Sequence, residues 1–344
     1  MSQTLGAVPK PGVGRITLAL LAVVPAAMAY PWQSTRAHWL IGVAVAALIL
    51  LFGWWRGLFL TTILHRRLAI IGRGGRAAPD PDADVRSTAL VRVGAAPSES
   101  DVLPLQLIAG YLDCYGIRAD SIRITNRDTV SGRRETWVGL TVSAVDNLPA
   151  LQARSSRIPL HETAEVAARR LADHLREIGW DAGTVVPEDV PELLATQSGK
   201  AARETWRSVQ QNSSDYIAAY RVTADSALAD TLSKVRSQQA REIWTALEIA
   251  PGDRGTRYTV AAACALRTDA APTGAAPTAG LTLERGNQGP ALAALDPLST
   301  RRLDGHTEAP ADLLSKLDWP TPAAGAHRAS DSEAATQVIA VGRT

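Results

Sequence analysis

The chain has 344 residues, of which 46% are hydrophobic and 20% charged, and its formal net charge is +2. That small charge hides a division at Arg76. Residues 1–76 contain eight Lys or Arg and no Asp or Glu, whereas the remainder carries six more acidic than basic residues. The acidic remainder argues against a general nucleic-acid-binding protein, and only two cysteines, Cys114 and Cys264, argue against a disulfide framework.

Two apolar runs dominate the N-terminal region. The residues Ile16–Thr35 and Ala37–Trp55 pass without a Lys, Arg, Asp or Glu. A helix needs about 20 apolar residues to cross the hydrocarbon core of a bilayer. The pattern therefore predicts a transmembrane hairpin over 13–60, with spans of about 13–31 and 38–60.

The basic residues of this region lie mostly outside the two runs, and Arg36 is the single one between them. Because Lys and Arg accumulate on the cytoplasmic side of membrane proteins, we expect both termini in the cytoplasm. Tryptophan and arginine favour the headgroup level. The predicted membrane-interface residues, in contact with lipid, are Trp32, Trp39, Trp54, Trp55, Arg56, Arg66 and Arg67.

A cleaved signal peptide is the alternative for the first run. Arg15 precedes the run, and Ala27–Ala29 has the small residues of a cleavage site. Cleavage would leave the rest of the topology unchanged. A retained first span is favoured, and Pro25 then predicts a kink in its helix.

Residues 61–86 are predicted to form a basic juxtamembrane helix and a linker. The apolar run that continues to Ile71 extends the second helix beyond the membrane, and the glycines of Gly72–Gly75 end it. The Pro79-Asp80-Pro81 sequence is typical of a linker.

Residues 87–319 are predicted to form a cytoplasmic α+β domain with antiparallel strand pairs, in which two units, 87–186 and 200–319, are possible. The order of periodicities is strand, helix, strand, strand, helix. Thr163–Ile178 is the clearest helix, with Thr163 as its N-cap, and Pro251–Gly255 indicates a hairpin turn. Trp319 is expected to be a last core anchor. The terminal segments 1–12 and 320–344 are predicted to be disordered.

A four-residue pattern recurs at the start of three predicted strands. Arg134-Glu135-Thr136-Trp137 is repeated as Arg203-Glu204-Thr205-Trp206 and more loosely as Arg241-Glu242-Ile243-Trp244. Two interpretations stay open: two related structural units, or a charged entry to each strand followed by an indole in the core.

The motifs of common enzyme classes are missing from the sequence. No phosphate-binding loop, dinucleotide fingerprint or nucleophile elbow occurs. One sequence, His161-Glu162-Thr163-Ala164-Glu165, resembles the opening of a zinc helix, but Glu165 stands in place of the second histidine. The favoured interpretation is that these carboxylates lie at the start of a helix and complement its macrodipole. We predict no catalytic residue, cofactor, metal or directly bound nucleotide.

The chain resembles the EccE family, a membrane component of the mycobacterial type VII (ESX) secretion machinery, and is most similar to the paralogue of the iron- and zinc-homeostasis system. The resemblance extends over nearly all of 16–319. It is carried by Pro31–Thr35, Trp54–Thr62, Gly110–Asp113, Asp146–Ser155, Arg169–Arg176 and Glu242–Glu248.

This resemblance implies a non-catalytic scaffold subunit in the bacterial inner membrane, assembled with EccB, EccC and EccD, where the ATPase EccC drives export of small helical and PE/PPE proteins. The polar segment between two predicted elements is a candidate docking site for a partner, with Arg154, Ser155 and Arg157 as its docking residues. The alternative is a membrane-tethered enzyme for lipid-linked or sugar-nucleotide substrates, which would need a convergent acidic pair and a metal.

Overall fold

The computed structural model describes residues 13–28, 35–55, 58–73, 85–98, 101–154, 159–194, 202–252, 258–310 and 312–322. The chain separates into two compact units, Met1–Gly74 and Gly75–Thr344. Predictions that fall on the terminal segments 1–12 and 323–344 lie outside the described residues.

The described residues of the first unit form three helices and a short hairpin. Helices α1 (Val13–Met28) and α2 (Thr35–Phe52) pack against each other, and strands β1 (Trp54–Trp55) and β2 (Leu58–Phe59) form an antiparallel pair before α3 (Leu60–Arg73). Among the residues described in this unit and the other, no helix has the length and apolar character required to cross a membrane.

The apolar pattern predicts that the second helix continues into α3, and this prediction is wrong. The helix ends at Gly53, whose N–H donates to the Ile49 carbonyl at 2.7 Å, while the Leu60 N–H donates to the Gly53 carbonyl at 2.8 Å. A Cβ on residue 53 would overlap the Ile49 carbonyl oxygen and the Leu60 side chain. Glycine therefore permits the close return of the chain that separates α2 from α3.

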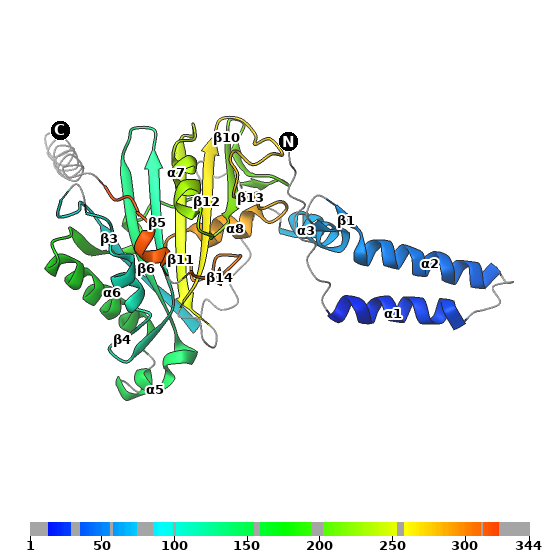
Figure 1. Cartoon of the computed structure of the whole chain (residues 1–344), viewed down its shortest axis with the longest axis horizontal. Coiled ribbons are helices and arrows are strands. Elements are labelled where there is room, and N and C mark those ends of the chain that lie inside the picture. The colour runs from blue at the N-terminus through cyan, green and yellow to red at the C-terminus, as the bar shows by residue number, and fades with distance from the viewer. Residues whose placement is uncertain are drawn as a thin grey trace, which may run out of the picture. The chain divides into compact units, whose positions relative to one another are not determined.

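The second unit contains one long antiparallel sheet (Figure 1). Its strand order is β7-β3-β6-β5-β11-β12-β10-β9-β8, with β13 paired to β10, β14 to β12 and β4 to β5. The strands are β3 (Arg86–Val93), β4 (Asp113–Cys114), β5 (Ile117–Thr129), β6 (Arg134–Ser143), β7 (Ala182–Val185), β8 (Arg203–Glu204), β9 (Val209–Asn212), β10 (Asp215–Val222), β11 (Glu242–Pro251), β12 (Tyr258–Thr268), β13 (Leu281–Leu283) and β14 (Thr307–Glu308). The predicted α+β class with antiparallel strand pairs is confirmed.

The sheet consists of two halves with the same plan. In each half a strand, a helix and a hairpin follow one another: β3-α4-β5-β6 in the first half and β10-α7-β11-β12 in the second. The two hairpins meet where β5 pairs with β11, and β3 and β10 lie outermost in their respective triplets. The ranges 87–186 and 200–319 thus contribute to one continuous sheet.

Helices cover one face of the sheet, where α6 packs on β3, β6 and β7 (Figure 1). That face buries the aliphatic stripes of four helices, together with Trp319. The opposite face is covered by α8 and by the segment that follows it. The remaining helices are α4 (Leu105–Gly110), α5 (Ala144–Arg154), α6 (Leu160–Glu177), η2 (Pro187–Asp189), α7 (Leu228–Arg236), α8 (Gln288–Leu295) and α9 (Leu313–Lys316).

One local expectation is corrected. The predicted N-cap Thr163 is buried inside α6, which begins at Leu160, after Pro159. Tyr115 and Gly116 form the turn between β4 and β5, where both residues have positive φ. The predicted anchor Trp319 is buried, and its Nε1–H donates to Asn126 Oδ1 at 2.9 Å.

A buried ion pair binds the segment after α8 to the sheet at the place where β5 of one half pairs with β11 of the other. The Nε of Arg123 on β5 lies 2.9 Å from Glu248 Oε2 on β11, and both side chains are almost wholly buried. The same guanidinium donates to the Asp296 and Ser299 carbonyls, while Glu248 accepts from the Leu303 N–H and lies 3.1 Å from His306 Nε2. Burial alone would raise the pKa of Glu248, but the charge of Arg123 lowers it overall.

Candidate functional site

Charged side chains of alternating sign cross five neighbouring strands on the face that carries α8. They are Asp215 of β10, Arg267 of β12, Glu242 of β11, Arg127 of β5 and Glu135 of β6. Arg267 lies 3.1 Å from Asp215 and 2.9 Å from Glu242, and Arg127 bonds both Glu242 and Glu135, the latter at 3.0 Å. We call these five residues the charge ladder.

The strand register explains the ladder, because Arg127 lies directly opposite Glu135 and Glu242 directly opposite Arg267. Facing side chains of opposite charge stabilise a strand pair. Burial alone would lower the pKa of Arg127, but Glu242 and then Glu135 raise it overall. Burial would raise the pKa of Glu242, but Arg127 and Arg267 lower it. Arg127 and Glu242 are therefore both charged at neutral pH.

Two tryptophans stack beside the ladder. The rings of Trp137 on β6 and Trp244 on β11 have centroids 6.0 Å apart and an interplanar angle of 13°. The Arg127 guanidinium carbon lies 5.7 Å from the Trp244 centroid, within the range of a cation–π interaction. The stacked indoles fix the position of Arg127 between its two carboxylates.

The recurring sequence pattern produces this arrangement. Strands β6 and β11 both run antiparallel to β5, so their first residues meet at the same end of the sheet. The glutamates of the two patterns then flank Arg127, and their tryptophans stack. The third copy lies apart on β8, where Glu204 accepts from the Gly289 N–H at 3.0 Å. The repeated pattern was a signal for this site, whereas no sequence signal marked Arg127.

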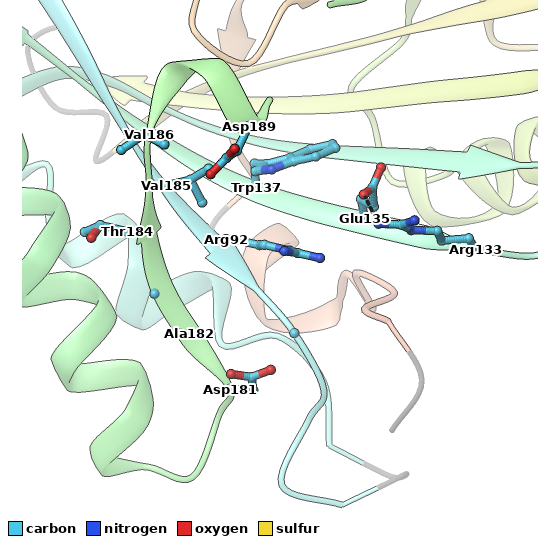
Figure 2. A pocket seen from close by; sticks show the side chains of 12 residues that line it. Arg92, Arg133, Glu135, Trp137, Asp181, Ala182, Thr184, Val185, Val186 and Asp189 are labelled. Atoms are coloured by element: carbon cyan, nitrogen blue, oxygen red, sulfur yellow. Dashed lines mark hydrogen bonds and ion pairs between the residues drawn. The ribbon is translucent and has the colours of Figure 1, made fainter. Parts of the chain in front are cut away.

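A groove with a volume of about 640 Å³ opens next to the ladder (Figure 2). It is bounded by β3, β6, β7 and η2, and Arg92, Glu135 and Trp137 lie on its sheet side. Two exposed carboxylates, Asp181 and Asp189, lie on either side of β7 along the chain. Its mixture of charged, aromatic and aliphatic groups suits the binding of a polypeptide segment.

The described residues offer few groups for chemistry beyond ionic binding. They contain no cluster of three His, Cys, Asp or Glu side chains arranged for a metal. His161 contacts Ser87 Oγ at 3.0 Å through Nδ1 and Glu165 at 3.3 Å through Nε2, and the two side chains of that ion pair are at least half exposed. The residues that resemble the start of a zinc helix thus make exposed polar contacts in the structure.

The predicted interface and docking residues are only partly described. Trp39 on α2 is 72% exposed, Arg66 and Arg67 lie on α3, and Trp54 and Trp55 form β1. Arg154 is the last residue of α5. Trp32, Arg56, Ser155 and Arg157 lie outside the described residues.

Comparison with known proteins assigns the family. The chain is 64% identical over 320 residues to the ESX-3 secretion system protein EccE3 of Mycobacterium tuberculosis strain CDC 1551 / Oshkosh, which covers 93% of this chain and 95% of that relative. This chain belongs to the EccE family. The EccE3 of Mycolicibacterium smegmatis is 50% identical over 293 residues, covering 85% of this chain and 90% of the relative.

The EccE family model, described as a type VII ESX secretion system translocon, matches residues 130–222. That span runs from the turn before β6 to the end of β10. It includes Trp137 of β6 and the β7 residues Ala182–Val185, which line the groove. The family resemblance expected from the sequence is confirmed. EccE is a component of ESX type VII secretion systems, and the family is named for that role and not for an enzymatic activity.

Proposed function

We propose that this chain is a structural subunit of a type VII secretion complex in the bacterial inner membrane, assembled with EccB, EccC and EccD. The observation that carries the proposal is family membership over nearly the whole chain. The second unit supports a scaffold role, because a continuous sheet with a salt-bridged face provides a rigid surface for partners.

The first unit supports a membrane attachment. Helices α1 and α2 pack on each other, yet many of their aliphatic side chains remain exposed, including Leu21 at 71% and Val43 at 59%. So large an apolar surface needs cover from lipid or from other membrane helices. We propose that the hairpin inserts into the membrane beside the other subunits, with both termini cytoplasmic.

Co-purification tests the subunit role directly. A tagged full-length chain extracted in mild detergent should retain EccB, EccC and EccD at constant ratios through size-exclusion chromatography. Recovery of the chain alone, with the other three subunits together in a separate fraction, would contradict the proposal.

A matched pair of variants tests the membrane attachment. Leu21→Asp with Val43→Asp places two charges on the exposed apolar surface, at about 3 kcal/mol each in a bilayer core. The doubly substituted chain should leave the membrane fraction and lose the other subunits. Val130→Asp, on an equally exposed valine of the second unit, should leave both properties unchanged. Equal behaviour of the two variants would refute the attachment.

A further inference from the structure

Strand β7 forms one end of the sheet, and its outer edge has no partner strand among the residues that the structure describes. In the part of the chain that the structure describes, β7 pairs only with β3, in the register Val93↔Ala182 to Leu90↔Val185. The Gly94 N–H donates to the Asp181 carbonyl at 2.7 Å, so the backbone of residue 181 faces β3.

Antiparallel residues face their partner strand alternately. Gly183 and Val185 accordingly face β3, and Ala182 and Thr184 direct their N–H and C=O groups to the open side. β7 has only four residues, but it contains no proline, lysine or bulge, which are three of the usual protections against strand addition.

Cavities lie on both sides of this edge. The groove of about 640 Å³ and a second cavity of about 220 Å³ share three lining residues, Thr184, Val185 and Val186. Figure 2 shows these three in succession along the end of β7. The second cavity is also lined by His161 and Glu165 at the start of α6. An added strand directs alternate side chains to opposite faces, so each cavity would receive every second side chain.

The charge around the edge specifies the occupant. Residues 181–194 contain four carboxylates and no Lys or Arg, and these carboxylates outnumber the three arginines that line the two cavities, Arg92, Arg133 and Arg169. All four carboxylate residues, Asp181, Glu188, Asp189 and Glu192, are exposed. A second copy of the chain would bring these carboxylates against their own equivalents, which like-charge repulsion disfavours. A basic segment would be attracted to the same surface.

We propose that the free edge of β7 binds an extended, basic segment of a partner polypeptide as an additional strand. Backbone hydrogen bonds to Ala182 and Thr184 supply the affinity, and the two cavities and the flanking carboxylates supply the preference for lysine or arginine. The proposal goes beyond the subunit role because it specifies the conformation and charge of what is bound, and it can fail while the subunit role stands.

Hydrogen exchange with a model peptide tests it. The probe is a peptide of about ten residues that alternates valine and lysine, long enough for one strand, and the control peptide alternates valine and glutamate. With the full-length chain in detergent, the lysine peptide should slow exchange of the residue 182, 184 and 186 amides. The glutamate peptide should bind at least about tenfold more weakly, and added salt should reduce the difference.

Two variants separate backbone pairing from charge. Thr184→Pro removes an N–H on the open side and should abolish peptide binding, whereas Thr184→Ser keeps the N–H and should bind normally. Asp181→Lys with Asp189→Lys keeps the strand and should reverse the preference towards the glutamate peptide. This double variant tests the charge preference even if the proline substitution disturbs folding.

Several outcomes would overturn the proposal. They are unchanged exchange at β7 with the lysine peptide, equal protection by both peptides, and an unaltered preference in the doubly reversed variant. Protection without peptide that rises with protein concentration would assign the edge to a second copy. Protection that disappears on removal of 323–344 would assign it to the chain's own C-terminal segment.

Discussion

Arg127 lies between two part-buried carboxylates, Glu135 and Glu242, and stabilises both. Its removal leaves Glu242 paired with Arg267 alone and Glu135 paired with the half-exposed Arg133 alone, and both carboxylates have little access to water. Since breaking a buried ion pair costs about 3 kcal/mol, we expect Arg127→Ala to lower the free energy of unfolding of the second unit by roughly that amount. Urea denaturation followed by tryptophan fluorescence measures it, because Trp137 and Trp244 lie beside the lost guanidinium.

Arg133→Ala is the matched control for this prediction. Arg133 bonds the same Glu135 at 2.9 Å, but its side chain is 50% exposed. Exposed ion pairs contribute about 0–1 kcal/mol, so the Arg133→Ala variant should unfold close to the wild-type midpoint. Equal destabilisation by the two substitutions would mean that burial does not determine how much each ion pair of the ladder contributes to stability.

Glu242 makes the stability of the ladder depend on pH. Burial alone would raise its pKa, but Arg127 and then Arg267 lower it below the value of 4.5 for a free glutamate. A carboxylate with a lowered folded pKa stabilises the protein above its unfolded pKa and loses that contribution as pH falls through the folded value. The stability difference between wild type and Glu242→Gln should therefore be full at pH 7 and shrink below about pH 4.5.

Unfolding midpoints measured between pH 7 and pH 3 provide the test. Glu177→Gln, on an exposed residue at the end of α6, serves as control and should stay close to wild type throughout. A Glu242→Gln difference that is constant across this range would contradict a role for the ionised carboxylate.

At the scale of elements, the segment after α8 is held by polar bonds rather than by regular structure. Residues 296–306 contain no helix or strand, and their backbone is bonded by the buried Arg123 and Glu248. Glu248→Ala leaves the Arg123 charge buried without its carboxylate, at a cost of about 3–5 kcal/mol. We expect amides of residues 296–306 to exchange faster with solvent than in wild type, by a larger factor than those of β3.

Asp304→Ala is the control for this element, because Asp304 is exposed in the same segment and its carboxylate accepts a long hydrogen bond from Asn287 at 3.5 Å. Its exchange pattern should match the wild type. Uniform acceleration over the whole unit in Glu248→Ala would show instead that the ion pair supports global stability and not this segment.

Sequence patterns predicted individual elements well where a turn signal separates two strands. The hairpin of β11 and β12 followed from the turn rich in Gly and Pro between them, although both strands are largely buried on both faces. The break at Gly53 did not, because apolar periodicity continues through it and only the packing of Leu60 against the glycine reveals the turn. An apolar run indicates side chains that avoid water, but it does not show whether a single helix continues through them.

At the scale of the whole molecule, the pairing of β5 with β11 lies beyond sequence reasoning. The two strands are separated by more than a hundred residues, and both are buried on both faces, so many strand orders satisfy the same pattern. The ladder and the groove depend on that pairing and on the position of β7. The recurring Glu and Trp residues were therefore visible in the sequence, but their convergence on Arg127 was not.

The strong charge division at Arg76 makes the orientation of the chain testable as a whole. With eight basic and no acidic residues up to and including Arg76, we expect both termini in the cytoplasm and the connection between α1 and α2 outside. A Ser34→Cys substitution in a Cys114→Ser background should react with a membrane-impermeant maleimide in spheroplasts.

The native Cys114, half-buried in the second unit, should react with that reagent only after the membrane is opened with detergent. Labelling of Cys114 in sealed spheroplasts would place the second unit outside and reverse the topology. Protection of the Ser34→Cys side chain until detergent is added would contradict the hairpin, since a chain that does not cross the membrane keeps residue 34 on the cytoplasmic side.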